Sequence, residues 1–146
     1  MSDVNLKLGG PVGLPFGTGV QYGVAERIID CAKDNIGSGY YAQLIDVPAD
    51  SLFLFATIEV QTAEGSAVTC DIGFRTIGGV EEDYDAVFND FSLNAVAKGC
   101  SWASGSAYQY GRYHSAAHEL VLIPSAALDK VKFVVRAYFV NTGLDT

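Results

Sequence analysis

Two histidines stand four residues apart, at His114 and His118, and Glu119 follows the second. On a helix this spacing would bring both imidazoles to one face, where they could bind zinc. The intervening Ser115-Ala116-Ala117 instead joins two predicted strands, and the His-Glu-x-x-His pattern of zinc enzymes is missing. We therefore expect surface or loop histidines rather than a metal site.

Hard oxygen donors cluster in one short segment, at Glu81, Glu82, Asp83, Asp85, Asn89 and Asp90. A calcium loop needs such donors at fixed offsets and a glycine that turns the chain sharply. The segment Glu81–Asp90 has neither feature. The pattern favours a hydrated acidic loop, and it leaves open a cation bound at a junction between subunits.

The patterns of nucleophilic and phosphate-binding enzymes are missing as well. The chain has no Gly-x-Ser-x-Gly turn, no Cys–His nucleophile pattern and no glycine loop that ends in Gly-Lys-Ser or Gly-Lys-Thr. Its three cysteines, Cys31, Cys70 and Cys100, are odd in number and widely spaced. This spacing indicates free thiols in a reducing cytosol rather than a disulfide framework. We expect no enzymatic activity, no cofactor and no resident metal.

Aromatic residues interleave with serine and glycine near the middle of the second half of the chain. The aromatic members are Trp102, Tyr108, Tyr110 and Tyr113, and Gln109 and Arg112 lie among them. Aromatic rings beside polar groups bind sugars and also pack protein interfaces. The segment therefore supports the hypothesis of a glycan platform, against the alternative that these rings pack within the domain, as most aromatic side chains do.

Short apolar segments separated by glycine, proline and serine turns must position these side chains. The segments are Gln21–Cys31, Tyr40–Val47, Leu52–Val60, Ala67–Phe74, Glu119–Pro124 and Val131–Val140. The stretch Glu81–Cys100 has no clear period, and we expect it to be irregular. About seven or eight short strands with such turns predict an all-β fold, an antiparallel β-sandwich of the jelly-roll type.

The first 19 residues differ from the rest, because seven glycines and prolines between Gly9 and Gly19 forbid a regular helix or a central strand. We interpret residues 1–19 as an extended arm and residues 20–146 as one β-sandwich domain. A backbone of this composition offers few internal hydrogen bonds and must find them elsewhere. The arm could lie on its own domain or on a neighbouring subunit, and this composition favours the neighbour, contacted through the apolar side chains of Leu6, Leu8, Val12, Leu14 and Phe16.

Composition narrows the classes of partner. The 146 residues suit one domain, and 17 acidic against 9 basic residues give a net charge of −8. This balance argues against binding to nucleic acid or to anionic membrane surfaces. The N-terminus has no signal-peptide pattern, and no apolar run has the length of a membrane span. Apolar residues make up 49% of the chain but charged residues only 18%, so we interpret the apolar excess as surface for partners.

Several segments together resemble the small capsid decoration (cement) proteins of tailed bacteriophages. The residues that carry the resemblance are Tyr40–Asp50, Ala56–Gly65, Val68–Gly73, Leu120–Pro124 and Val131–Val140. They include an Asp-Val-Pro-Ala turn, a strand that ends in a Thr-Ala turn, and an Asp-x-Gly strand end. The likeness covers most of residues 40–140. It implies a virion protein, often trimeric, on the outer face of an icosahedral head, and it transfers no catalytic residues.

We therefore expect a structural protein that binds the outside of an assembled phage capsid as a homotrimer and stabilises it. Its partners would be the major capsid protein and further copies of itself, without nucleic acid or membrane, and assembly would take place in the host cytoplasm. The arm would contact the capsid, and self-association would use Phe53, Phe55, Tyr138 and Phe139. The alternative is a receptor- or glycan-binding module of a phage tail or fibre, with the aromatic segment between Trp102 and Tyr113 as its platform.

Overall fold

The computed structural model describes residues 21–77 and 81–141, and within them the chain forms nine strands and one short 3₁₀ helix. The strands are β1 (Gln21–Asp30), β2 (Ala42–Val47), β3 (Ser51–Thr62), β4 (Thr69–Thr76), β5 (Glu81–Ser92), β6 (Ala97–Cys100), β7 (Arg112–His114), β8 (His118–Pro124) and β9 (Lys132–Asn141). The helix η1 spans Ser101–Ala103. The described residues contain no helix with the length and apolar character that a membrane crossing requires.

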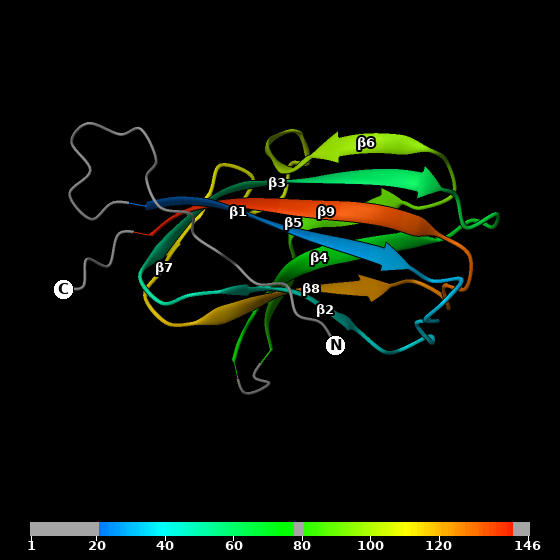
Figure 1. Ribbon diagram of the computed structural model, residues 1–146, viewed down its shortest axis with the longest axis horizontal. Coiled ribbons are helices and arrows are strands. Elements are labelled where there is room, and N and C mark those ends of the chain that lie inside the picture. The colour runs from blue at the N-terminus through cyan, green and yellow to red at the C-terminus, as the bar shows by residue number, and fades with distance from the viewer. Residues whose placement is uncertain (1–20, 78–80, 142–146) are drawn as a thin grey trace.

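Two antiparallel sheets pack face to face (Figure 1). One sheet has the order β1-β9-β3-β6, with β7 paired to the other end of β3, and the second has the order β2-β8-β4-β5. The pairs are nested: β1 with β9, β2 with β8, β3 with β6 and β7, and β4 with β5. This is the pattern of one long hairpin rolled into a sandwich, so the fold is the predicted jelly roll.

Side chains that alternate inward along both sheets fill the space between them. Phe53 on β3 contacts Phe74 on β4 and Phe139 on β9, with ring centroids 5.1 and 5.6 Å apart. All three rings are at most 1% exposed. The contact of Phe53 with Phe74 joins the first sheet to the second, and aromatic burial of this kind supplies much of the stability of a domain of this size.

The two short strands that pair with the same edge of β3, β6 and β7, leave a gap beside the middle of β3. The strand β6 pairs with Thr57–Val60 and β7 with Ser51–Phe53, so neither strand reaches Ala56. The backbone N–H of Ala56 instead donates to Oγ of Ser101, at 2.9 Å, in a buried hydrogen bond. This bond holds η1 against β3, where Trp102, the residue after Ser101, contacts Phe55.

The stretch that we expected to be irregular, residues 81–100, contains two strands, β5 and β6. Its periodicity is hidden because the pairing of β5 with β4 shifts register at three places. Each shift changes which side chains point inward, so three consecutive residues, Ala86, Val87 and Phe88, are all buried. The prediction of an irregular acidic loop was wrong for this reason, and the strand count rises from seven or eight to nine.

Candidate functional site

An aromatic row lies on the outer face of the first sheet. Tyr138 of β9 stacks on Phe55 of β3, with ring centroids 4.4 Å apart and planes within 20°. Phe55 in turn contacts the ring of Trp102 in η1 at 4.6 Å. Trp102 is 53% exposed, so the row ends in a large apolar side chain that solvent reaches. Exposed aromatic rings that contact one another in a row are typical of protein interfaces.

A bulge in β3 brings Phe55 to this face. The register of β3 against β9 shifts between Phe53 and Phe55, so Phe53 points into the core while Phe55 points outward. Without the shift the two residues would share a face, because side chains alternate with a period of two. The bulge thus converts a core position into a surface aromatic.

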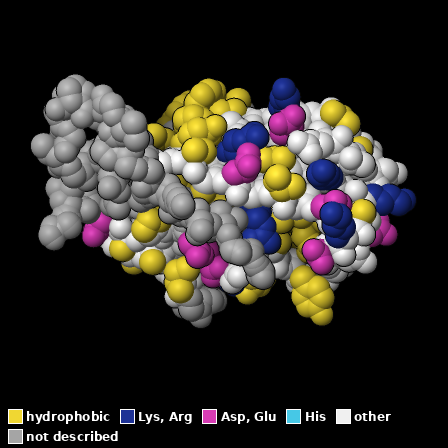
Figure 2. All heavy atoms as spheres, in the orientation of Figure 1, with side chains coloured by type: hydrophobic (Ala, Val, Ile, Leu, Met, Phe, Trp, Pro, Cys, Tyr) yellow, Lys and Arg dark blue, Asp and Glu magenta, His cyan; other side chains and the backbone are white. Residues whose placement is uncertain are grey.

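Apolar side chains extend the row on both sides. Val24 of β1 lies opposite Tyr138 and is half exposed. One row further along β3, Leu52 lies between Val140 of β9 and the half-exposed Tyr113 of β7. We call this surface the aromatic face, and its members are Val24, Leu52, Phe55, Trp102, Tyr113, Tyr138 and Val140. Figure 2 shows hydrophobic side chains gathered above the beginning of β3.

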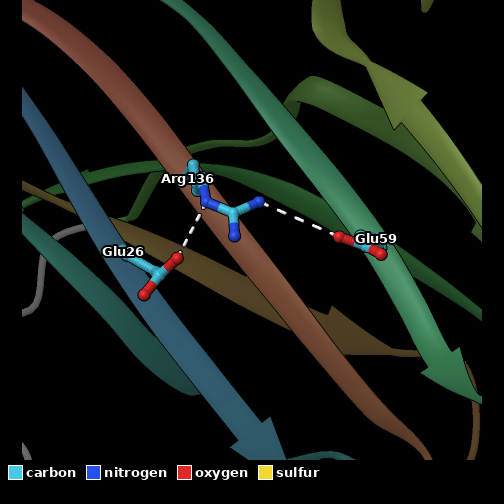
Figure 3. A network of polar contacts seen from close by, with 3 residues as sticks. All are labelled: Glu26, Glu59 and Arg136. Atoms are coloured by element: carbon cyan, nitrogen blue, oxygen red, sulfur yellow. Dashed lines mark hydrogen bonds and ion pairs between the residues drawn. The ribbon is translucent and has the colours of Figure 1, made fainter.

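A charged row borders the aromatic face. Arg136 of β9 lies between Glu26 of β1 and Glu59 of β3, as Figure 3 shows. Its Nε donates to Oε2 of Glu26 at 2.8 Å, and its Nη1 lies 3.9 Å from Oε1 of Glu59. The three side chains are 36–46% exposed, so the ion pairs contribute little to stability. An apolar surface with a charged border has the layout of a protein interface, in which charges at the rim favour the correct partner.

The four residues that we expected to mediate self-association lie on opposite sides of the sheet. Phe53 and Phe139 are 0% and 1% exposed and pack between the sheets, so their side chains cannot contact a second copy. The prediction was wrong for these two. Phe55 and Tyr138 lie on the aromatic face. The alternation of Tyr138 and Phe139 along β9 was a signal that could have separated them.

The predicted glycan platform is divided in a similar way. Trp102 and Tyr113 belong to the aromatic face, but the ring of Tyr108 packs inward against Phe74, at 6.0 Å between centroids. The backbone N–H of Tyr108 donates to the carbonyl of Ala86, which ties this segment to β5. Tyr110 is 82% exposed and stands in the loop before β7. No single platform of four rings therefore exists.

The two histidines are buried, which corrects the expectation that they lie on the surface or in a loop. His114 is 1% exposed and His118 5%, and their ring centroids lie 4.5 Å apart. Burial, together with the nearby charges of His118 and Arg112, lowers the pKa of His114 to about 3. Neither ring nitrogen of His114 has a hydrogen-bond partner within the described residues. The sequence pattern did not predict this pair. His114 lies directly opposite the buried Ser51 of β3, and this pairing, which places His114 on the inward side of the sheet, is known only from the register of β7 against β3.

Two of the three cysteines are equally inaccessible, whereas Cys100 is partly exposed. Cys31 and Cys70 are buried free thiols, and burial raises the pKa of Cys31 to about 12 and that of Cys70 still further above the ordinary value. Both thiols are therefore protonated at neutral pH and unreactive. In residues 21–77 and 81–141, no three His, Cys, Asp or Glu side chains come together in a way that could hold a metal ion.

One buried carboxylate has a clear structural role. Glu64, in the loop between β3 and β4, is 4% exposed, and it accepts hydrogen bonds from the backbone N–H groups of Asp129, Lys130 and Val131 at 2.9–3.2 Å. Burial alone would raise the pKa of Glu64, but these backbone donors outweigh it and lower the pKa. Glu64 thereby holds the turn that leads into β9, the strand that carries Tyr138.

The arm residues expected to contact the capsid, Leu6, Leu8, Val12, Leu14 and Phe16, lie outside the described residues. Their role stays a prediction.

Comparison with known proteins gives matches in structure only. No protein-family model matches the chain, and no curated protein matches its sequence. A chain in the acidic stable capsid structure of Helicobacter pylori bacteriophage KHP30 is similar, with a TM-score of 0.56 and 16% identity over 82% of this chain and 86% of that one. A chain in the capsid of Ralstonia phage GP4 has a TM-score of 0.60 and 13% identity, over 82% and 84%. A chain in the capsid asymmetric unit of cyanophage Pam1 has a TM-score of 0.55 and 12% identity, over 96% of each.

These similarities establish a fold rather than a family, because identity is low throughout. The fold is a small jelly-roll sandwich that also occurs in chains of phage capsids. The alignments cover at least 84% of each matched chain, so those chains are close to this one in length. The correspondence is therefore between whole chains.

Proposed function

We propose that this protein is a structural virion protein that binds the outside of an assembled phage capsid as a homotrimer and stabilises it. The observation that carries the proposal is the aromatic face, an apolar surface on a domain that shares its fold with capsid chains of similar length. A half-exposed tryptophan in contact with an outward phenylalanine leaves apolar surface in water when the domain is isolated. A surface of this kind is expected to be covered in an assembly.

Self-association through the aromatic face follows from its layout. Covering apolar surface gains about 25 cal/mol per Å² before the entropic costs of association are met. The bordering Glu26 and Arg136 carry opposite charges and can pair with the same residues of another copy. Closed rotational symmetry would cover the face in every copy and leave no apolar edge for further growth.

Stabilisation of the capsid follows from selective binding. A protein that binds only the assembled lattice shifts the equilibrium toward that lattice by mass action. Three arms on one trimer would act together, because after the first arm binds the others are held at a high local concentration. The net charge of −8 also suits the outside of a particle whose surface must not adhere to nucleic acid.

The receptor- or glycan-binding alternative on a tail or fibre has less support. It needs the rings of Trp102, Tyr108, Tyr110 and Tyr113 on one surface, but Tyr108 packs against the core residue Phe74. The two rings that share a surface, Trp102 and Tyr113, belong to the aromatic face.

The arm is tested by its deletion. Phage heads that lack this protein are mixed with the full chain or with a variant from which residues 2–19 are deleted, and bound protein is measured after sedimentation. We expect the deletion to weaken binding about tenfold or more, on the order of 1.4 kcal/mol. Val96→Ala, a change at an exposed apolar residue in the loop before β6, serves as the control and should bind like the wild type. Equal occupancy by the deletion variant would refute the role of the arm.

A further inference from the structure

A cleft of about 590 Å³ opens on the side of the sandwich where the edge strands β1 and β2 lie, together with the segment 31–41 that joins them. In Figure 1 these strands are the blue and teal ribbons, connected at their right-hand ends. The cleft shares no lining residue with the aromatic face, and the proposed function does not use it. Pockets of roughly 300–1,000 Å³ are the size that holds small organic ligands.

The walls of the cleft are fixed by backbone hydrogen bonds. Ile36 and Leu128 exchange two of them, at 3.0 and 2.8 Å, which anchors the joining segment to the loop before β9. At the two ends of this segment, Cys31 N–H donates to the carbonyl of Val131 at 2.9 Å and Tyr40 N–H to that of Gly37 at 3.2 Å. A preformed cleft loses little entropy when a ligand binds.

A buried arginine forms part of the lining. Arg75 of β4 is 4% exposed, and its Nε donates to Oε2 of Glu119, directly opposite on β8, at 3.0 Å. The guanidinium carbon lies 3.9 Å from the centre of the Tyr41 ring. The carboxylate and the ring hold the guanidinium in place, and the guanidinium in turn holds the Tyr41 ring at the wall of the cleft.

The remaining lining combines exposed aromatic surface with donors and acceptors of both kinds. Tyr40 is 70% and Tyr41 42% exposed, and both line the cleft. The polar groups around them are the side chains of Arg27, Asp30, Asp34, Asn35 and Gln43. Arg75 is neutralised by Glu119, and Arg27 stands against Asp30 and Asp34, so the cleft has no positive excess that would select an anion.

From this arrangement we propose that the cleft binds a neutral saccharide. A sugar ring presents an apolar C–H face, which can lie on the exposed tyrosine rings, and hydroxyl groups, which both donate and accept hydrogen bonds. Amides, carboxylates and guanidinium groups at the same wall match these hydroxyls. A free anion would meet the carboxylates of Asp30 and Asp34, and an apolar ligand would bury them without partners.

The test begins with the full chain on an array of neutral and uronic-acid oligosaccharides. The tightest neutral ligand found is then titrated into the isotope-labelled protein, and backbone amide signals are followed by NMR. We expect a neutral ligand that shifts the amide signals of residues 34–43, with a Kd on the order of 1 mM or tighter. Tyr40→Ala and Gln43→Ala, both at exposed side chains, should weaken binding about tenfold or more without changing thermal unfolding.

Tyr110→Ala is the matched control, because it removes an exposed tyrosine from a different loop and should leave binding unchanged. The proposal is overturned if no neutral oligosaccharide binds, or if uronic-acid oligosaccharides bind more tightly than their neutral counterparts. It is also overturned if the shifted signals belong to the aromatic face, or if Tyr110→Ala weakens binding and Tyr40→Ala does not.

Discussion

His114 illustrates how much of the chemistry of a residue depends on its surroundings. Its ring lies 4.5 Å from the rings of both Phe74 and His118, inside the sandwich. In the unfolded chain the pKa of a histidine is about 6.5, whereas burial, His118 and Arg112 lower the pKa of folded His114 to about 3. The folded protein therefore excludes a proton that the unfolded chain binds.

This difference predicts a loss of stability in acid. Between about pH 6.5 and about pH 3 the unfolded state binds more protons, so the free energy of unfolding falls as the pH falls. At pH 4.5 the expected loss from this one residue is about 2–3 kcal/mol relative to neutral pH. His114→Phe should remove that loss, because phenylalanine has a similar shape and binds no proton.

Urea unfolding of both proteins at pH 7.5 and pH 4.5 measures the effect. We expect the variant to be the more stable protein at pH 4.5 and close to the wild type at pH 7.5. An equal decrease in both proteins would show that other groups cause the acid sensitivity.

At the scale of elements, the register shifts between β4 and β5 determine where the two backbones come closest. Ile72 of β4 lies opposite Phe88 of β5, and Phe74 lies opposite Asp83. The β5 residues between Asp83 and Phe88 therefore have a single β4 residue, Gly73, opposite them. A Cβ atom at Gly73 would lie 1.9 Å from the carbonyl oxygen of Asp83 and 2.5 Å from the carbonyl carbon of Tyr84. Only glycine allows the backbone of β5 to approach this closely.

Gly73→Ala should therefore lower the free energy of unfolding by about 1–3 kcal/mol, the range for overpacked positions. Gly99→Ala is the matched control: its Cβ would meet the ring of Phe91 at 2.6 Å, and a partly exposed ring can rotate away. Urea denaturation of the two variants measures both effects. If Gly73→Ala is as stable as the wild type, or less affected than Gly99→Ala, the close approach of β5 is not what requires glycine here.

At the scale of the whole molecule, the apolar excess of the composition separates into a core and a surface. The core takes the inward side chains of both sheets, and the aromatic face takes a second set on the outside of the first sheet. An apolar surface beside charged residues is what a subunit of an assembly presents before it meets its partners.

Light scattering on the purified protein tests the proposed trimer. We expect a molar mass three times that of the 15.5 kDa chain, and a lower mass for Phe55→Ala and Tyr138→Ala, since truncation of buried interface aromatics costs about 2 kcal/mol or more. Tyr110→Ala should keep the trimer mass. A wild type that stays monomeric, or trimers unaffected by both substitutions, would refute self-association through the aromatic face.

Local pattern was sufficient for much of the fold. The alternation of apolar residues and the glycine, proline and serine turns predicted six of the strands and the jelly-roll class, because period and turn chemistry depend on neighbours in the chain. The missing catalytic patterns and the net charge were likewise properties of the sequence alone, and they limited the classes of function.

Other features depended on the tertiary structure. A bulge turned Phe55 outward while Phe53 stayed in the core, and β5 was not recognised because its register shifts hide the period. The burial of His114 and the meeting of Tyr41 with Arg75 required strands far apart in the chain to pair in one register. Local sequence sets the conformation of each segment, but the face that a side chain occupies and the residues it meets depend on long-range pairing, which only the folded chain determines.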